Sequence, residues 1–151
     1  LVVIGNGSRY AEVVKKYIAE NQLQKSIIFL SESGQAAGLK DGRDLPAIYQ
    51  GATALIYPNF FEGFGIPILE ALWSGLPVVS SNVSCMPETA GNAALYAHPA
   101  DEKLFAEHLF NIATHAELGA ELKNKGRVHA ANFTQEKCAA AVMQVYKYIV
   151  K

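Results

Sequence analysis

The chain has 151 residues, of which 50% are hydrophobic and 18% charged, and its formal net charge of −1 is typical of one ordinary soluble globular domain. No basic run is present, which excludes nucleic acid as the main partner, and no apolar run is long enough to span a membrane. Cys85 and Cys138 have neither metal-ligand spacing nor the density of a disulfide scaffold, so we expect free thiols, no metal site and a reducing, cytoplasmic compartment.

The first predicted elements are a buried strand, a turn and an amphipathic helix. Residues 1–4 are all apolar and are followed directly by Gly5, Asn6 and Gly7. The next apolar side chains recur at helical spacing and predict a helix packed on a sheet: Tyr10, Val13, Val14, Tyr17 and Ile18. The glycines are typical of a dinucleotide-binding turn. Tyr10 stands where that motif has its third glycine, which favours a plain strand-to-helix turn.

A second strand is predicted over 26–30, followed by a long polar loop. Residues 31–43 contain three glycines and show no periodicity, so they form a loop of a length that is often functional or mobile. Asp44 is placed to cap a short helix over 45–50. A third strand over 54–57 then leads into the loop that holds Glu62.

A glycine-rich turn stands directly before a helix that contains Glu70. Pro67 suits the first helical turn, and the helix ends at Ser74 because Gly75 supplies a left-handed cap and Pro77 prevents continuation. The apolar face of this helix comprises Ile68, Leu69, Leu72 and Trp73. Glu70 therefore faces away from the core, one turn from a helix N-terminus whose free amides attract negative groups.

The rest of the chain predicts two more strands and several helices. The strands cover 78–80 and 94–96, with a short helical turn over 87–90 between them. Asp101 caps a helix whose buried face comprises Leu104, Phe105, His108, Leu109 and Ile112. Five strands that alternate with helices imply an α/β fold, with a parallel, doubly wound sheet.

Two further helices close the predicted fold. Leu118, Leu122 and Val128 indicate a helix that is interrupted or capped near Gly126. Thr134 caps the last helix, whose inward-facing residues are Ala141, Val142, Val145, Tyr146 and Ile149. We expect both helices to cover the sheet or a second domain.

The turn before Glu70 leads to a hypothesis about the ligand. Gly63 and Gly65 let the backbone approach a ligand closely, and the helix that follows favours a phosphate. Two carboxylates tolerate a phosphate nearby when they accept hydrogen bonds from hydroxyl groups, and a nucleotide sugar offers both phosphate and hydroxyls. The alternative is a loop glutamate at Glu62 and a solvated helix glutamate at Glu70. The position beyond the carboxyl end of the third strand favours a ligand site.

At these residues the chain resembles a known enzyme family. Seven residues separate Glu62 from Glu70, and the first glutamate begins the run Glu62-Gly63-Phe64-Gly65. This pattern is similar to the E-x7-E signature of retaining glycosyltransferases of the GT-B fold, family 4, group 1 type. Segments 74–81 and 86–99 resemble the same family in order and spacing. The resemblance implies a Rossmann-like domain that forms the carboxy-terminal, donor-binding half of a two-domain enzyme.

The resemblance also implies the roles of individual residues. Glu62 would contact hydroxyls of the donor sugar near the reacting carbon as the catalytic residue, and Glu70 would accept hydrogen bonds from the ribose hydroxyls. The remaining residues expected at the donor site are Gly5, Gly7, Arg9, Ser31, Gly63, Phe64, Gly65 and Ile66. Among these, the amides of the last three residues would meet the sugar and diphosphate. Ser31 and Glu32 replace the glycine that family members often have near the nucleobase, which leaves the base contacts open.

The expected partners follow from the same resemblance. They are a nucleotide-diphosphate sugar donor and a sugar, lipid or polysaccharide acceptor, with no cofactor and no required metal. The first strand-helix unit and the amino-terminal acceptor domain are expected to be absent from this chain, and the full-length enzyme is compatible with peripheral membrane association. Alternatives are a non-catalytic nucleotide-sugar-binding or assembly module, a sugar-nucleotide epimerase and a glycogen-type phosphorylase. A glycosidase pair fits less well, because one glutamate is on a loop and the other on a helix beside a phosphate-type turn.

Overall fold

A computed structural model of the chain describes residues 1–5, 9–32 and 42–150, without the side chain of Arg9. The chain forms two compact units, Leu1–Leu45 and Pro46–Lys151, and each is described by itself. Most of the predicted 31–43 loop lies outside the described residues.

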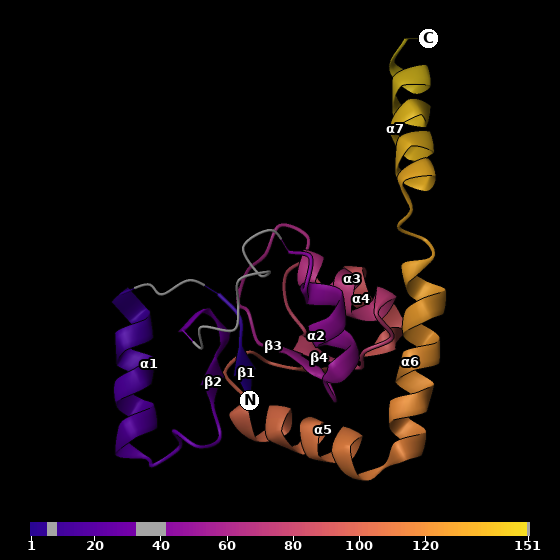
Figure 1. Cartoon of the computed structure of the whole chain (residues 1–151). Coiled ribbons are helices and arrows are strands. Elements are labelled where there is room, and N and C mark those ends of the chain that lie inside the picture. Colours follow the sequence, from indigo (N-terminus) through magenta and orange to yellow (C-terminus); the bar gives the residue numbers. More distant parts are fainter. Residues whose placement is uncertain (6–8, 33–41, 151) are drawn as a thin grey trace. The chain divides into compact units, whose positions relative to one another are not determined.

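In its described residues, the first unit contains two parallel strands and one α-helix (Figure 1). β1 (Val2–Val3) pairs with β2 (Ile28–Phe29), and α1 (Arg9–Glu20) connects them in sequence. The second strand ends earlier than predicted, because a 3-10 helix covers Leu30–Glu32.

The predicted inner face of α1 is only partly correct. Ile18 is buried and Val14 is half-buried, but three other members of the apolar stripe are exposed within this unit: Tyr10, Val13 and Tyr17. A two-stranded sheet of two residues per strand offers too little surface to cover the whole stripe.

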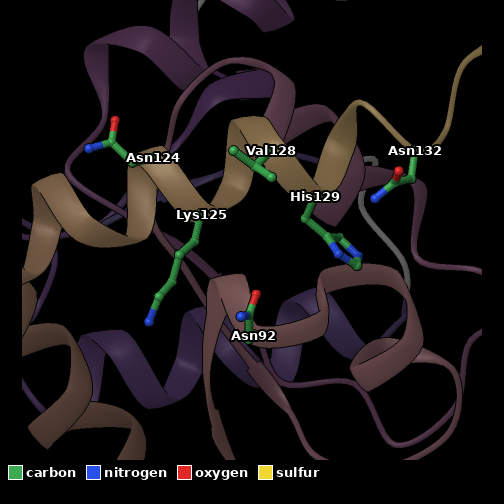
Figure 2. A pocket seen from close by; sticks show the side chains of 6 residues that line it. All are labelled: Asn92, Asn124, Lys125, Val128, His129 and Asn132. Carbon is green, nitrogen blue, oxygen red and sulfur yellow. The ribbon is translucent and has the colours of Figure 1, made fainter.

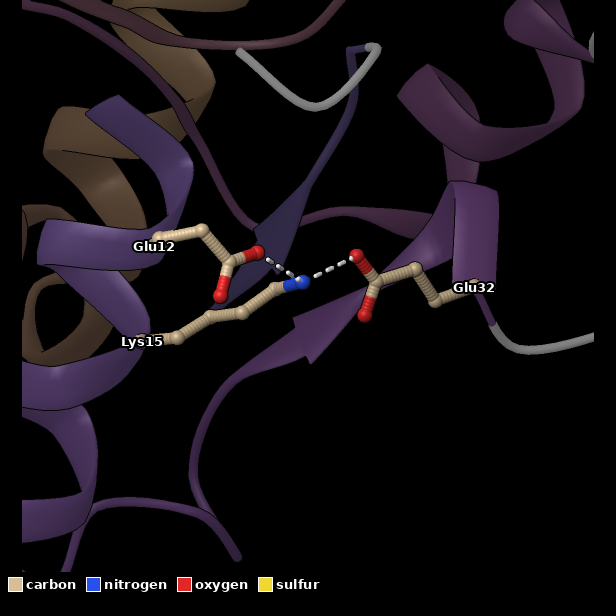
Figure 3. A network of polar contacts seen from close by, with 3 residues as sticks. All are labelled: Glu12, Lys15 and Glu32. Atoms are coloured by element: carbon tan, nitrogen blue, oxygen red, sulfur yellow. Dashed lines mark hydrogen bonds and ion pairs between the residues drawn. The ribbon is translucent and has the colours of Figure 1, made fainter. Parts of the chain in front are cut away.

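Lys15 joins α1 to the segment after β2 (Figure 3). Its ammonium nitrogen lies 2.7 Å from Glu32 Oε1 and 3.2 Å from Glu12 Oε1, and it stands 5.9 Å from the centre of the Phe29 ring. The hydrogen bonds to Glu32 and Glu12 raise the pKa of Lys15. Lys15 therefore ties the helix to both the strand and the 3-10 turn of this unit.

The second unit is built on a parallel sheet of three strands in the order β3-β4-β5. β3 (Leu55–Tyr57) pairs with β4 (Val78–Ser81), which pairs with β5 (Ala94–Ala97). All four residues of the central strand β4 are buried. All five predicted strands are present, every pairing is parallel and helices connect successive strands, so the predicted α/β fold is confirmed.

Helices α2 (Leu45–Gly51), α3 (Ile66–Trp73) and α4 (Met86–Ala90) follow the predicted boundaries closely. Ile68 and Leu72 of α3 are fully buried as expected. Ala71 is also buried, whereas Trp73 is 52% exposed, so the buried face is rotated toward Ala71 relative to the prediction. Gly75 adopts the predicted left-handed conformation, with φ of 71°.

Helix α5 (Glu102–Thr114) closes one core cluster over β4 and β5. Asp101 caps it as predicted, since its carboxylate accepts a hydrogen bond of 3.0 Å from the Leu104 amide. The cluster consists of Val79, Ala97, Phe105, Ile112 and Leu122. His108, on the predicted inner face, is half-buried and lies 3.1 Å from the Tyr96 carbonyl oxygen.

Helix α6 (Ala116–Ala130) is continuous, so the predicted interruption near Gly126 is wrong. Gly126 is buried where α6 lies beside α3, and a Cβ added there would stand 3.0 Å from Leu72 Cδ2. This glycine therefore allows the two helices to approach closely. Of the three residues that indicated this helix, Leu122 is buried, whereas Val128 is 75% exposed.

The final helix α7 (Gln135–Ile149) begins at the predicted cap, because Thr134 accepts a hydrogen bond of 3.3 Å from the Lys137 amide. The burial predicted for this helix is wrong. None of its residues is buried, and the exposed side chains include Val142, Val145, Tyr146 and Ile149. Helical periodicity identified the apolar stripe correctly, but nothing in the described part of the chain covers it.

Candidate active site

The backbone turn before α3 has a geometry that requires glycine at position 65. Gly65 occupies the N-cap position of α3 with φ of 83°, a left-handed conformation that side chains disfavour. A Cβ at Gly65 would also stand 3.2 Å from Ile68 Cδ1. In the described part of the chain, the amides of Phe64, Gly65 and Ile66 donate to no backbone carbonyl, so they are available to an anionic or hydroxyl-bearing ligand.

The Glu62 carboxylate is held in place by two neighbours. Its Oε1 accepts a hydrogen bond of 2.8 Å from the Tyr57 hydroxyl and one of 2.5 Å from Asn59 Nδ2. Tyr57 is the last residue of β3, so the orientation of the carboxylate is fixed by the end of a strand. Both of these hydrogen bonds are accepted by the same oxygen. Among the described residues, no donor is hydrogen-bonded to Oε2, which can therefore accept a hydrogen bond from a ligand.

The Glu62 backbone is fixed from the loop after β4. The Glu62 amide lies 3.3 Å from Ser84 Oγ, while the Ser84 hydroxyl and the Cys85 thiol lie 3.0 and 3.2 Å from the Glu62 carbonyl oxygen. Ser84 has φ of 56°, which is uncommon for a residue other than glycine. Such strained positions cluster at functional sites, and here the strained residue holds Glu62.

Two buried serines of β4 anchor the start of the same loop. Ser81 Oγ donates to the carbonyl oxygen of Asn59 at 2.5 Å, and Ser80 Oγ lies 3.3 Å from the carbonyl oxygen of Tyr57. Both serines are fully buried. The central strand thus positions the backbone that presents both hydrogen-bond donors to Glu62.

Glu70 is half-buried on α3 and is paired with a tyrosine of α2. Its Oε2 accepts a hydrogen bond of 3.1 Å from the hydroxyl of Tyr49, which is itself buried. The carboxylate faces away from the core as predicted, but it does not stand alone in solvent. Because one carboxylate accepts several hydrogen bonds, capacity remains for a ligand hydroxyl.

The two tyrosines that contact these carboxylates keep their protons. Burial, followed by the nearby charge of Glu70 and the hydrogen bond to it, raises the pKa of Tyr49. Burial and the hydrogen bond to Glu62 also raise the pKa of Tyr57. Each hydroxyl is therefore a permanent donor to its glutamate at neutral pH.

The structure brings together the site residues that were predicted around α3. Glu62, Gly63, Phe64, Gly65, Ile66 and Glu70 lie in one loop and the helix that follows it. Gly5, with φ of 150°, and Ser31, in a 3-10 helix, lie in the other unit. Arg9 begins α1, its side chain is not described, and Gly7 lies outside the described residues.

Sequence analysis missed the residues that support the two glutamates: Tyr49, Tyr57, Asn59, Ser80, Ser81 and Ser84. One signal was available for Tyr57. It ends a half-buried apolar strand, and the hydroxyl of a tyrosine that is partly buried usually finds a partner. The Tyr49 to Glu70 contact joins two helices, and no local pattern in the sequence predicts it.

Two further findings concern the described residues only. They contain no group of three or more His, Cys, Asp or Glu side chains arranged to hold a metal ion. None of their helices is long and apolar enough to cross a membrane.

Known proteins share this sequence and this fold. A model of the family described as glycosyl transferases group 1 matches residues 1–115. The O-antigen chain mannosyltransferase B of Escherichia coli is 37% identical over 112 residues, which are 74% of this chain and 29% of that protein. The O-antigen chain mannosyltransferase RfbU of Salmonella typhimurium is 33% identical over 112 residues, again 74% of this chain and 30% of the relative.

Two solved structures match nearly the whole chain. Sucrose-phosphate synthase from Thermosynechococcus elongatus superposes with a TM-score of 0.81 at 24% identity, covering 99% of this chain and 38% of that one. A glycosyltransferase from Rickettsia africae gives a TM-score of 0.79 at 23% identity, with coverage of 99% and 40%. At these identities the structures establish the fold, which is the predicted Rossmann-like half of a GT-B architecture.

The chain spans less than a third of the length of the two curated relatives named above. Its family match, in contrast, covers most of the chain and includes the whole segment from β3 to β5 that holds Glu62 and Glu70. The chain therefore belongs to the group 1 glycosyltransferases.

Proposed function

We propose that this chain forms the donor-binding half of an enzyme that transfers a hexose from a nucleotide diphosphate to an acceptor hydroxyl, with retention of anomeric configuration. The observation that carries the proposal is the Glu62 carboxylate, fixed through one oxygen beside a glycine turn with free amides. Mannose is the first sugar to test, because two relatives are named as mannosyltransferases.

Glu62 is proposed to act on the transferred sugar. Tyr57 and Asn59 hold Oε1, so Oε2 accepts a hydrogen bond from a sugar hydroxyl next to the reacting carbon. A carboxylate at this position also favours the positive charge that develops on the sugar ring as its bond to the diphosphate breaks. Fixing the carboxylate in advance avoids reorganisation at the moment of reaction.

The turn over 63–66 is proposed to receive the diphosphate. When the bond between the anomeric carbon and the phosphate oxygen breaks, the leaving diphosphate keeps the electron pair and gains negative charge. The free amides of Phe64, Gly65 and Ile66, with the positive end of the α3 dipole, stabilise this charge. Backbone N–H groups thus stabilise the negative charge on the leaving diphosphate, as a metal ion does in other transferases.

Glu70 is proposed to bind the ribose hydroxyls of the donor. The Tyr49 hydroxyl holds Oε2 of the carboxylate, which leaves Oε1 to accept from the ribose. Glu62 and Glu70 are separated by seven residues, as in the family 4 signature, and we assign the chain to that family. The role of Gly5, Gly7, Arg9 and Ser31 in donor binding remains part of this proposal.

The proposal extends to the whole enzyme. An amino-terminal domain outside this chain would bind the acceptor, which is a sugar, lipid or growing polysaccharide. A first strand-helix unit, also outside this chain, would bring an Arg and a Lys to the donor diphosphate. Polysaccharide biosynthesis at the cytoplasmic side of a membrane fits the relatives that are named for O-antigen chains. Peripheral association of the full-length enzyme with that membrane would bring it to its acceptor.

A transfer assay with the full-length enzyme tests this function. A panel of nucleotide sugars that includes GDP-mannose is mixed with saccharide and lipid-linked acceptors, and the anomeric configuration of any product is determined by NMR. We expect a product with the configuration of the donor, and a large loss of turnover in Glu62→Gln. Inverted product, or full turnover in Glu62→Gln, would overturn the proposed mechanism.

A further inference from the structure

We propose that His129 and Phe133, at the carboxyl end of α6, are positioning residues that hold the 63–66 turn in its donor-binding shape. The inference rests on the proposed function, since it assumes that this turn receives the diphosphate. It assigns a role in the site to His129 and Phe133, which both lie more than sixty residues after Glu62 in the sequence.

Thr89 makes the first contact with the turn. Its side chain is almost fully buried, with 1% exposed, and its hydroxyl donates to the carbonyl oxygen of Phe64. That carbonyl belongs to the same planar peptide group as the Gly65 amide. By fixing the carbonyl, Thr89 fixes the direction in which the Gly65 N–H points.

His129 contacts the backbone of Thr89. Its Nε2 lies 3.1 Å from the Thr89 carbonyl oxygen, and because a carbonyl only accepts, Nε2 is the nitrogen that donates. The ring packs tightly on Gly91, where a Cβ would come within 2.5 Å of Cε1. Only glycine at position 91 leaves room for the ring to reach Thr89.

Phe133 makes a second, independent contact with the turn. Its ring meets the Phe64 ring edge-on, with centroids 5.7 Å apart and an angle of 70° between the planes. The His129 ring lies 5.4 Å from the Phe133 ring on the same helix end. The Phe64 residue is therefore held at its carbonyl through Thr89 and at its side chain through Phe133, and both supports meet at His129.

His129 can be reached from solvent. It lines an open cavity of about 350 Å³. The other lining residues, drawn in Figure 2, are Asn92, Asn124, Lys125, Val128 and Asn132. A small molecule of the size of imidazole fits this cavity. Removal of the His129 side chain therefore creates a vacancy that added imidazole can fill.

The test compares two ligands on the full-length enzyme. Calorimetry measures the dissociation constants of a nucleoside, which does not reach the turn, and of its diphosphate, which does. In wild type the diphosphate binds more tightly than the nucleoside. In His129→Ala or Phe133→Leu we expect the ratio of the two dissociation constants to fall about tenfold. Nucleoside affinity stays unchanged, because Glu70 and Tyr49 are not disturbed.

Chemical rescue and matched variants sharpen the result. Added imidazole should restore diphosphate binding to His129→Ala and leave Phe133→Leu unchanged. Gly91→Ala should reproduce the loss, since the new methyl group displaces the His129 ring. Val128→Ala, on the same cavity but exposed to solvent, is the control and should bind both ligands as wild type does.

Each outcome has a separate meaning. A loss confined to the diphosphate and reversed by imidazole supports the positioning role. Unchanged diphosphate binding in His129→Ala and Phe133→Leu overturns it, as does an equal loss of nucleoside and diphosphate affinity. A wild-type enzyme that binds the nucleoside and its diphosphate with equal affinity would instead contradict the proposed function itself.

Discussion

The Glu62 carboxylate shows how single residues prepare this site. A carboxylate oxygen with two donors at 2.8 and 2.5 Å is held firmly, and charge-assisted hydrogen bonds are stronger than neutral ones. Tyr57 is the last residue of β3, and Asn59 lies two residues after it and three before Glu62, so a short loop contains the whole arrangement.

The first prediction concerns the hydroxyl of Tyr57. Tyr57→Phe removes a hydrogen bond to a charged group, worth roughly 1.5 to 3 kcal/mol, and we expect turnover of the full-length enzyme to fall about 10-fold to 100-fold. Affinity for nucleoside diphosphate should stay unchanged. Tyr96→Phe is the matched control, because its hydroxyl donates to the Gly91 carbonyl and contacts neither glutamate. Equal turnover in both variants would remove Tyr57 from the mechanism.

The second prediction concerns stability at high pH. Burial raises the pKa of Tyr96 from 10.0 to about 12, and the pKa values of Tyr49 and Tyr57 are raised as well. The unfolded chain loses these protons first, so stability is complete below pH 10 and falls as the pH rises toward 12. Denaturant titrations from pH 8 to pH 12 should show this fall, and a shallower one in Tyr96→Phe. A flat profile would contradict the assignment.

Spacing and glycine content predicted a site at Glu62, Glu70 and the turn between them, and their roles stay a prediction. The side chains that support these residues could not be predicted. Tyr49 meets Glu70 across 21 residues and Thr89 meets Phe64 across 25, and contacts at such separation follow from packing and leave no local pattern.

At the scale of elements, the packing of α6 on α3 depends on Gly126. From sequence alone, Gly126 predicts an interruption or cap of the helix, because an isolated glycine lowers helix propensity. The structure gives it a packing role, since α6 continues through it and meets Leu72 there. Periodicity alone does not distinguish a helix end from a close helix contact.

The third prediction compares two glycines of this helix. Gly126→Ala places a methyl group 3.0 Å from Leu72 Cδ2, whereas at Gly119 the nearest atom to a new Cβ is the Ile112 oxygen at 3.9 Å. Overpacking should cost about 1 to 3 kcal/mol and outweigh the gain in helix propensity at Gly126. Gly119→Ala should gain about 0.5 to 1 kcal/mol. The free energies of unfolding, measured in urea, check this. A more stable Gly126→Ala would show that the helices are not in close contact.

Helix boundaries were predicted well where caps or prolines mark them, as at Asp101, Thr134 and Pro67. The inner faces were predicted less well. An apolar stripe shows which face a helix can bury, but the neighbour that buries it has to be present. On α1 and α7 that neighbour is missing from the described residues, so most of their apolar side chains are exposed.

At the scale of the whole molecule, the exposed apolar surface of α7 leads to the fourth prediction. Val142, Val145, Tyr146 and Ile149 are each more than half exposed on a single helix, and such contiguous patches promote association. The 151-residue chain expressed by itself should therefore associate with rising concentration in sedimentation experiments. Val142→Lys combined with Tyr146→Lys should shift it toward the monomer. A wild-type chain that stays monomeric throughout would mean that the patch is covered.

The α/β class and the order of strands could be predicted because each strand is a short apolar run between helical segments. The division into two units could not, because no change of composition marks the boundary between Leu45 and Pro46. The family was recognised from one continuous segment around Glu62 and Glu70. This segment forms the best-packed part of the second unit, where Ile68, Leu72, Val78 and Val79 have no exposed surface.

The most direct measurement of the central claim is a calorimetric titration of nucleoside diphosphates into the full-length enzyme and two single variants. Glu70→Ala should weaken binding about 10-fold to 100-fold, because it removes a charged acceptor from the ribose. Glu62→Gln should bind as wild type does, because its proposed contacts are to the sugar that a nucleoside diphosphate lacks. Equal affinity in wild type and Glu70→Ala would contradict the donor-binding role of this domain.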